Sequence, residues 1–426
     1  MQDGRPAMTD APAALVAALR SPGGRSLLQE VCDATAERRR RPAFLAGLRR
    51  RHPAPLVTLA LRVAEAAERA PRKFPDADRL LFTPALLEQA TPHPVAARRA
   101  ARLAPLGRVL DAGCGAGGDL TRLALAGAAV VGLERDPLAA ALAAANLAAV
   151  GGWGEVRRGV FPADAPAAVD ALFVDPARRD PGRGPAGARR RRDPADFAPA
   201  PGEIRPWLDR VAGWAVKWGP GLPLDHAALT APGAVLAGLT REAYAVEVVS
   251  WNGAVREAVL WGGACRPEGR TATLLVGGPA DAAAHVYRGD PDAPPPPVIE
   301  PGPYLAEPDG ALLRAGLLNA FAREHDLALL APGIAYLTAE RPVGGPWLRW
   351  WRRLATFPFS LRRLQRELTA AGAGRVVVKK RGFPLAPEEL RRRLRLRGEQ
   401  EMVVFIHRTS RGHMVHLGVP DAGAGD

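Results

Sequence analysis

The sequence predicts a protein of the α/β class, built around a doubly wound, mostly parallel sheet of seven strands. Between residues 105 and 290, apolar runs of strand length alternate with helical patterns, as is typical of such sheets. Apolar residues recur at helical spacing through residues 1–80. A proline-rich linker at 291–303 separates the core from a shorter region of alternating strands and helices. The chain is therefore expected to contain a helical N-terminal region, an α/β core and a small α+β domain.

The core is expected to span residues 81–290. Its predicted strands cover residues 108–111, 129–134, 155–161, 170–175, 212–218, 245–251 and 272–277. An Asn252-Gly253 turn leads into the apolar run 257–261, which is expected to form the last antiparallel pairing of the sheet. The α+β domain is predicted at 304–418, with helices at 312–323, 359–370 and 387–396 and strands at 334–337, 375–379 and 401–408. Residues 419–426 are predicted to be a disordered tail.

The 426 residues suffice for two or three domains, and the formal net charge of +14 favours a polyanionic partner such as RNA or DNA. The only lysines are Lys73, Lys217, Lys379 and Lys380, so arginine carries nearly all of the positive charge. Alanine, glycine, proline and arginine are all abundant, as a GC-rich genome encodes, so codon usage is a second source of this charge. Arginine attracts phosphate whatever its origin.

The three cysteines, Cys32, Cys114 and Cys265, lie far apart in the sequence. Neither they nor the eight histidines have the spacing of metal ligands, so no metal site is predicted. No apolar run approaches the ~18 residues of a membrane span, and the N-terminus lacks the apolar core of a signal peptide. A soluble, cytoplasmic protein is therefore expected.

A glycine-rich turn follows the first predicted core strand, in the sequence RVLDAGCGAGGD. The strand ends on Asp111, and Gly113, Gly115 and Gly117 let the backbone approach a ligand closely. The second strand ends on Glu134, about 20 residues further on, where a carboxylate can accept hydrogen bonds from ribose hydroxyls. This spacing predicts a βαβ unit that binds a nucleoside. A tight turn in an α/β domain without a nucleotide is the alternative.

A second polar motif ends the strand at 170–175, which delivers Asp175 and Pro176 to the carboxyl edge of the sheet. Ligands bind at this edge, where Asp175 can orient a substrate as an acceptor or act as a base. A turn aspartate is the structural alternative. Arg178 and Arg179 follow, and they can either bind a substrate phosphate or form salt bridges with nearby acids.

The form D-x-G-x-G-x-G, with the acid before the glycines, resembles motif I of the class I S-adenosylmethionine (SAM) methyltransferases. Roughly residues 70–418 are similar to the bacterial members of this class that carry a THUMP-like C-terminal domain. The motifs that carry the resemblance are Lys73-Phe74-Pro75, Phe82-Thr83-Pro84, Asp175-Pro176-Ala177-Arg178-Arg179, Glu257-Ala258-Val259-Leu260-Trp261, Tyr304-Leu305-Ala306-Glu307-Pro308, Arg314-Ala315-Gly316 and Val378-Lys379-Lys380-Arg381-Gly382.

The resemblance implies a Rossmann-like catalytic core, a ferredoxin-like C-terminal domain and SAM as the cofactor. The glycine turn would pack against the methionine part of SAM, and Glu134 would hold its ribose. Asp164 is the candidate for the adenine contact, because the class places an acid after the third strand; a surface turn aspartate is the alternative. Asp175 and Pro176 match the start of motif IV, but Ala177 and Arg178 replace its usual second proline and aromatic residue.

THUMP domains bind RNA in tRNA-modifying enzymes, so the resemblance implies RNA modification, the methylation of a base of tRNA or rRNA. Lys379, Lys380 and Arg381 are predicted in a basic loop, where they either contact phosphate or form a solvated turn. The alternatives are a non-catalytic RNA-binding protein with this fold and a methyltransferase for a small molecule or a protein. Lys217, a lone lysine in an apolar strand, is expected to pair with an acid or to lie at a strand end, and facing the substrate cleft is the functional alternative.

Overall fold

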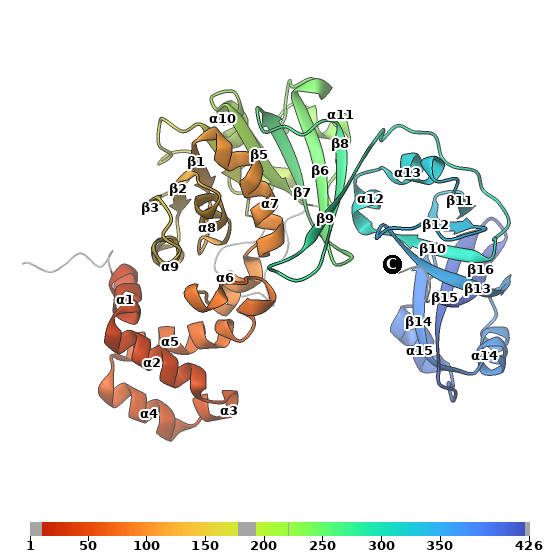
Figure 1. Cartoon of the computed structure of the whole chain (residues 1–426), viewed down its shortest axis with the longest axis horizontal. Coiled ribbons are helices and arrows are strands. Elements are labelled where there is room, and N and C mark those ends of the chain that lie inside the picture. Colours follow the sequence, from red (N-terminus) through yellow and green to blue (C-terminus); the bar gives the residue numbers. More distant parts are fainter. Residues whose placement is uncertain (1–10, 178–192, 220, 422–426) are drawn as a thin grey trace, which may run out of the picture. The chain divides into compact units, whose positions relative to one another are not determined.

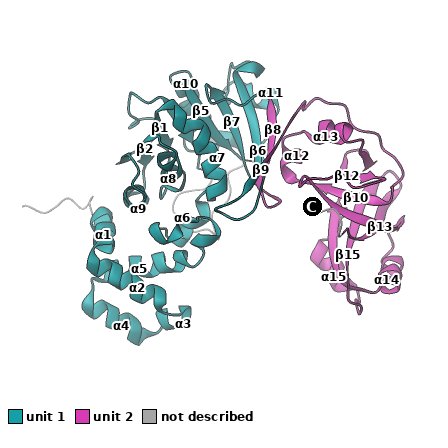
Figure 2. Ribbon diagram, in the orientation of Figure 1, with its two compact units in different colours: residues 1–249, 256–268, 275–284 teal, residues 250–255, 269–274, 285–426 magenta. Residues whose placement is uncertain are grey.

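The computed structural model describes residues 11–177, 193–219 and 221–421, so the predicted site residues Arg178 and Arg179 lie outside the described residues. The chain forms two compact units (Figure 2). Unit 1 comprises Met1–Val249, Arg256–Glu268 and Leu275–Ala284, and unit 2 comprises Ser250–Val255, Gly269–Leu274 and His285–Asp426. The last segment of unit 2 therefore begins at His285, a few residues before the predicted linker at 291–303.

The N-terminal region is helical, as predicted. Its helices are α1 Ala11–Arg20, α2 Pro22–Asp33, α3 Ala36–Arg39, α4 Pro42–Arg51 and α5 Ala54–Ala67, followed by the 3₁₀ turns η1 Ala70–Arg72 and η2 Ala77–Arg79. Ser21 and Thr35 cap α2 and α3 by accepting the backbone N–H groups of Gly24 and Arg38. Proline lies in the first turn of α2, α4 and α5, where its missing N–H forfeits no helical hydrogen bond.

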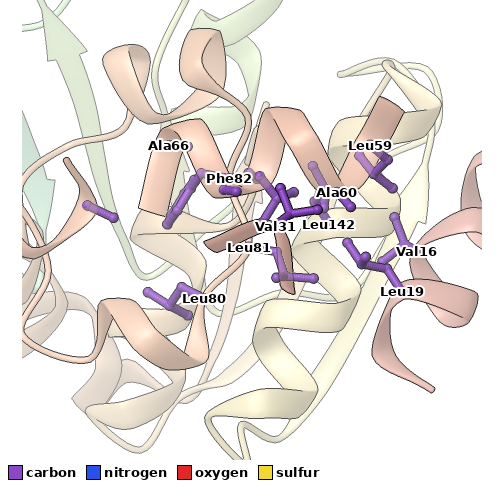
Figure 3. Close-up of a cluster of buried hydrophobic side chains, with 14 of the residues drawn as sticks. Val16, Leu19, Val31, Leu59, Ala60, Ala66, Leu80, Leu81, Phe82 and Leu142 are labelled. Atoms are coloured by element: carbon purple, nitrogen blue, oxygen red, sulfur yellow. The ribbon is translucent and has the colours of Figure 1, made fainter. Parts of the chain in front are cut away.

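Apolar side chains of these helices form a buried cluster that reaches into the core (Figure 3). Val16, Leu19 and Leu59 come from the N-terminal helices, whereas Leu142 comes from α9 (Pro137–Ala149). Phe82, from the segment before α6 (Pro84–Gln89), belongs to the same cluster. The helical region and helix α9 therefore share one hydrophobic core.

The first sheet has the strand order β3-β2-β1-β4-β5-β7-β6-β8-β9 (Figure 1). Its strands are β1 Arg108–Ala112, β2 Ala129–Glu134, β3 Gly154–Arg158, β4 Ala171–Val174, β5 Gly213–Trp218, β6 Tyr244–Trp251, β7 Ala254–Gly263, β8 Arg270–Val276 and β9 Ala283–Gly289. The first five strands pair in parallel, and β7 is antiparallel to β5. The predicted α/β core is confirmed, and the seven predicted strands correspond to β1–β6 and β8. Strand β7, from the run 257–261, and β9 bring the sheet to nine strands. The sequence gives little indication of β9 because no apolar run marks it.

The strand order reverses between β1 and β4, since β2 and β3 lie on one side of β1 and β4 and β5 on the other. Such a reversal leaves a crevice outside the carboxyl ends of the two central strands, where α/β proteins bind ligands. The glycine turn follows β1 and Asp175 follows β4, so both motifs fall at this crevice. The other helical elements here are α6 Pro84–Gln89, α7 His93–Leu103, η3 Ala104–Leu106, α8 Gly118–Leu125, η4 Pro194–Asp196, α10 Pro201–Leu208, α11 His226–Thr230 and η5 Arg241–Ala243.

The hairpin predicted from Asn252-Gly253 joins β6 and β7. Both residues have positive φ angles, 49° for Asn252 and 77° for Gly253, as a tight two-residue hairpin turn requires. This turn lets β7 run back between β6 and β5, so the predicted antiparallel pairing of 257–261 is confirmed.

Unit 2 contains a second sheet with the strand order β11-β12-β10-β13-β16-β15-β14. Its strands are β10 Tyr304–Pro308, β11 Ala328–Ala331, β12 Ile334–Ala339, β13 Leu348–Pro358, β14 Ala373–Arg381, β15 Gln400–Thr409 and β16 Gly412–Pro420. Its helices are α12 Gly310–Arg314, α13 Leu318–Glu324, α14 Leu361–Ala370 and α15 Pro387–Arg393. The α+β composition is confirmed, but the single helix predicted at 312–323 is two.

Two details of the predicted C-terminal domain are wrong. From β13 onward the elements run β-α-β-α-β-β, whereas a ferredoxin-like fold runs β-α-β-β-α-β. β14 and β15 are parallel because α15 crosses between them. Strand β16 also continues to Pro420, with Val419 opposite Arg352, so the strand extends into the region predicted as a tail from residue 419.

Unit 2 buries a pair of neutral histidines, His407 on β15 and His416 on β16, whose Nε2 atoms lie 2.9 Å apart. Nδ1 of His407 donates to the carbonyl of Arg408, so its Nε2 accepts the proton of His416 Nε2. Nδ1 of His416 then accepts from the Thr356 hydroxyl. Burial lowers the pKa of both rings, to about 3 for His416 with help from the neighbouring His407.

Unit 2 is therefore expected to lose stability as the pH falls below about 6.5, where the unfolded chain protonates both histidines and the folded chain does not. His416 alone would cost on the order of 2 kcal/mol at pH 5. Thermal unfolding between pH 8 and pH 5 measures this loss. A His407→Leu/His416→Leu variant should flatten the pH dependence, whereas His285→Leu should keep it; equal curves for the two variants contradict the account.

Candidate active site

The glycine turn after β1 forms an open cradle. The backbone N–H groups of Gly113 and Cys114 donate to the carbonyl of Leu133, at 2.8 and 3.1 Å, and hold the turn beside the end of β2. Gly115 and Gly117 have φ angles of 56° and 81°, which favour glycine. A Cβ on Gly115 would meet no atom within 4 Å, so its open side leaves room for a ligand.

Glu134 clamps this turn from the end of β2. Its Oε2 accepts the backbone N–H of Gly115 at 2.9 Å, and its Oε1 accepts that of Asp136 at 2.8 Å. A carboxylate has about four acceptor positions, so further hydrogen bonds to ligand hydroxyls remain available. The structure thus brings together Glu134 and the glycine turn, which the sequence predicted as one site.

Asp111 is buried beneath the turn. Burial raises the pKa of its carboxyl well above the ordinary range, and the neighbouring Asp119 raises it further. Its Oδ2 has no hydrogen-bond partner among the residues that the structure describes. A buried acceptor with no donor from the protein is typical of a site where a ligand donates an N–H group.

Arg99 of α7 joins the charged groups of the site, although no sequence pattern marks it. Its two Nη atoms lie 2.6 Å from Asp119 Oδ1 and 2.7 Å from Glu257 Oε1, and its guanidinium lies 4.2 Å from the Phe173 ring centroid. Burial raises the pKa of Glu257 to about 7. Its Oε2, like Oδ2 of Asp111, finds no donor in the described part of the chain.

Acidic groups outnumber basic groups in this cluster. Arg99 and Lys217 interact with four carboxyl groups, those of Asp111, Asp119, Asp175 and Glu257. A cationic ligand group would be favoured beside such a set, because it stabilises the charged forms of carboxyls whose pKa burial raises.

Asp175 and Pro176 follow β4 at the same edge of the sheet. Asp175 Oδ2 lies 2.5 Å from Lys217 Nζ, so the expectation that Lys217 pairs with an acid is confirmed. Beyond Pro176, the backbone N–H groups of Ala177 and Ala198 donate to each other's carbonyls at 2.7 and 3.2 Å and fix the backbone at Ala177.

Asp164 lies beyond β3 and contributes to its own turn. Its Oδ2 accepts the backbone N–H of Val160 at 2.7 Å, and its backbone N–H donates to the Val160 carbonyl. The neighbouring Gly159 donates to the carbonyl of Glu134 at 3.0 Å. The loop therefore starts beside Glu134, and the adenine contact stays a prediction.

Asn146 of α9 links the glycine turn to the segment before α6 by hydrogen bonds. Its Nδ2 donates to the carbonyls of Ala116 and Leu81 at 2.9 Å, and its Oδ1 accepts the backbone N–H of Leu81 at 2.7 Å. Lys73 also has a structural role. Its Nζ donates to the carbonyls of Leu87, Glu88 and Ala90 around the end of α6. Burial lowers the pKa of Lys73 to about 8.

Lys379, Lys380 and Arg381 lie on strand β14 and not in a loop. Lys379 Nζ pairs with Glu307 Oε2 at 2.6 Å, and Lys380 Nζ donates to the Phe383 carbonyl at 3.0 Å. The guanidinium of Arg381 lies 5.3 Å from the ring centroid of Tyr336. These interactions within the protein account for all three side chains, and their binding to phosphate stays a prediction.

Within the described ranges, no group of three or more histidine, cysteine, aspartate or glutamate side chains could hold a metal ion. None of the described helices is long and apolar enough to cross a membrane. The three cysteines are free thiols.

The crevice at the strand reversal, the glycine cradle and the acid at the end of β2 define an α/β protein that binds a nucleoside-containing cofactor. Residues 348–418 match the THUMP domain-like family. The chain is also 38% identical over 345 residues to an uncharacterised SAM-dependent methyltransferase of Mycobacterium tuberculosis strains CDC 1551 and H37Rv, and the match covers 79% of this chain and 87% of the relative. The chain belongs to the SAM-dependent methyltransferases: it is an enzyme, and SAM is its cofactor.

A solved structure shares the fold of this chain. The crystal structure of a candidate methyltransferase from Porphyromonas gingivalis W83 is similar to this chain, with a TM-score of 0.70 and 19% sequence identity. The similarity covers 93% of this chain and 98% of that protein, so the two share a fold over nearly their full lengths.

The residues of the crevice fit SAM. The open side of Gly115 leaves room beside the turn, and the unpartnered Oδ2 of Asp111 can accept an N–H group such as that of the cofactor's ammonium. The excess of buried acids suits the positive charges of its ammonium and sulfonium groups.

Gly115→Ala is expected to weaken SAM binding about tenfold or more, because the added methyl group enters the cradle. Gly151→Ala is the matched control: Gly151 also has a positive φ of 70° and open space around a Cβ, but it lies in the turn after α9. Both variants carry similar backbone strain, about 1 kcal/mol. Calorimetry should find the affinity of Gly151→Ala for SAM unchanged. Equal weakening of SAM binding in both variants would show that backbone strain, and not the methyl group in the cradle, causes the loss.

Proposed function

We propose that this enzyme methylates a base of tRNA or rRNA in the cytoplasm, with RNA held by residues 348–418. The observation that carries the proposal is the distribution of charge. Residues 348–418 contain seventeen lysines and arginines but only five acidic residues, a net charge of +12, which leaves +2 for the rest of the chain. Codon usage would spread arginine along the whole sequence, so it does not account for this concentration. RNA is a polyanion that such a region attracts.

Exposed arginines of α14 and of the segment after α15 support this role. Arg362, Gln365 and Arg366 share one face of α14, because they are three and four residues apart. Gln365 Nε2 donates to the carbonyl of Arg395 at 2.8 Å, and Gln365 Oε1 accepts its backbone N–H at 2.7 Å. These bonds hold Arg395 beside the two helical arginines. We call Arg362, Arg366 and Arg395 the arginine surface.

The residues of the crevice have separate roles in this proposal. Gly113, Gly115 and Gly117 form the cradle for SAM, and Glu134 accepts its ribose hydroxyls. When bound, SAM supplies an electrophilic methyl group. Asp175 accepts a hydrogen bond from the N–H of the base and orients its nitrogen, while Pro176 restricts the loop. Aligning the two reactants is the main task of the protein in such a transfer.

Binding to RNA is expected to weaken steeply between about 50 and 200 mM salt, because lysine and arginine side chains that bind phosphates release counterions. An Arg362→Gln/Arg395→Gln variant should bind more weakly, and the slope of log K against log salt should fall by about 1 for each phosphate that is no longer bound. Arg49→Gln/Arg50→Gln is the control, because it removes the same charge from two exposed residues of α4. Absence of RNA binding at the lowest salt would overturn the proposal and favour a small-molecule or protein substrate.

A further inference from the structure

Lys217 and Asp175 face each other at the carboxyl edge of two neighbouring strands. β4 and β5 are parallel, with Val174 opposite Val216, so Asp175 and Lys217 are the next residues in register. Lys217 Nζ lies 2.5 Å from Asp175 Oδ2 and donates a second hydrogen bond to Thr91 Oγ1 at 3.2 Å. The ammonium group is therefore fixed from two sides.

The two side chains differ in exposure. The Lys217 side chain is 11% exposed, whereas that of Asp175 is 31% exposed. Among the described residues, Asp175 Oδ2 accepts from Lys217, and no hydrogen bond is found for Oδ1. The described residues thus hold the carboxylate by one oxygen and leave the other oxygen to a ligand.

The surroundings of Lys217 keep it charged. Burial alone would lower the pKa of its ammonium, but the carboxyl groups of Asp175, Glu257 and Asp119 outweigh burial and the nearby Arg99, so its pKa is raised. An ion pair buried in this way adds little net stability, because desolvation offsets the attraction between the charges. A role in the site accounts for the pair better than stability does.

We propose that Lys217 is a positioning residue, which fixes the Asp175 carboxylate so that its free oxygen accepts the N–H of the methyl acceptor. The proposal rests on the function proposed above for Asp175. The methyl acceptor is then a nitrogen that carries a hydrogen. As the N–CH3 bond forms and the S–CH3 bond breaks, the electron pair of the broken bond stays on sulfur, and the N–H proton passes to Asp175.

The test compares Lys217→Met and Lys217→Arg, alone and combined with Asp175→Asn, in the full-length protein. Lys217→Met should lower kcat about 100-fold with the Kd for SAM unchanged, because a misplaced acceptor slows the reaction without weakening the cofactor. Lys217→Arg should recover part of kcat. In the Asp175→Asn background, Lys217→Met should cause no further loss, since Lys217 acts through Asp175.

The control variant is Arg98→Met, which breaks the 2.7 Å ion pair of Arg98 with Glu247 elsewhere in unit 1. It should leave kcat close to that of the wild type. An unchanged kcat in Lys217→Met, or losses that add in the double variant, would overturn the positioning role. A crystal structure of Lys217→Met gives a readout that needs no RNA substrate: Asp175 should change rotamer, and an unmoved Asp175 overturns the inference. A wild-type enzyme that does not methylate RNA contradicts only the proposed function.

Discussion

Replacing Asp175 with asparagine is expected to lower the rate of methyl transfer by about 10²- to 10⁴-fold and to leave the affinity for SAM unchanged. An asparagine side chain has one acceptor and one donor end. Lys217 Nζ, 2.5 Å from the carboxylate, needs an acceptor and would take the amide oxygen. The amide NH2 group would then face the N–H of the methyl acceptor, and two donors repel each other. Initial rates of labelled methyl transfer, with calorimetry for SAM, measure both quantities.

Asp170→Asn is the matched control for this substitution. Asp170 lies just before β4, at the opposite end of the strand from Asp175, and its Oδ2 accepts the backbone N–H of Arg108 at 2.7 Å. Its replacement also removes a hydrogen-bonded carboxylate next to β4, but at the end of the strand away from the crevice. If the two variants lose activity equally, the loss follows from damage to β4, and Asp175 has no direct role in the transfer.

Glu134→Ala is expected to raise the Kd for SAM by about 10- to 100-fold, because hydrogen bonds to a charged group contribute roughly 1.5–3 kcal/mol each. The substitution removes the proposed acceptor for the ribose and also the clamp on the Gly115 N–H. Glu155→Ala, an exposed acid on the neighbouring strand β3, should leave the Kd unchanged. Calorimetry with both variants measures the difference.

A 2′-deoxyribose analogue of the cofactor separates the two roles of Glu134. If the carboxylate binds the ribose, the wild type should prefer SAM over the analogue, and Glu134→Ala should lose this preference. A preference of the same size in both proteins would leave Glu134 only the role of holding the turn.

The local parts of the site could be predicted from the sequence. The glycine turn, Glu134 and Asp175 each lie at the carboxyl end of an apolar strand, and these ends of parallel strands meet at one edge of the sheet. Strand and helix patterns also indicated the order of the core elements. These features depend on residues close together in the chain, so the spacing of residues in the sequence is enough to predict them.

The remaining interactions depend on residues far apart in the chain. Arg99 pairs with Glu257, 158 residues away, and Asn146 binds the backbone of Leu81, 65 residues away. No local pattern links such residues, because tertiary packing alone brings them together. The sequence does not indicate strand β13, because arginines interrupt its apolar pattern. It does not indicate the pairing of Lys379 with Glu307 either, because the two residues lie 72 positions apart on different strands.

The most direct test of RNA methylation by this enzyme is the transfer of a labelled methyl group from SAM to total RNA of a strain that lacks this gene. Mass spectrometry of the nucleosides then identifies the methylated position. Label is expected in tRNA or rRNA, in one nucleoside whose methyl group is bound to nitrogen, and no label is expected with Asp175→Asn. Binding of both SAM and RNA without any transfer to RNA would contradict RNA methylation by this enzyme.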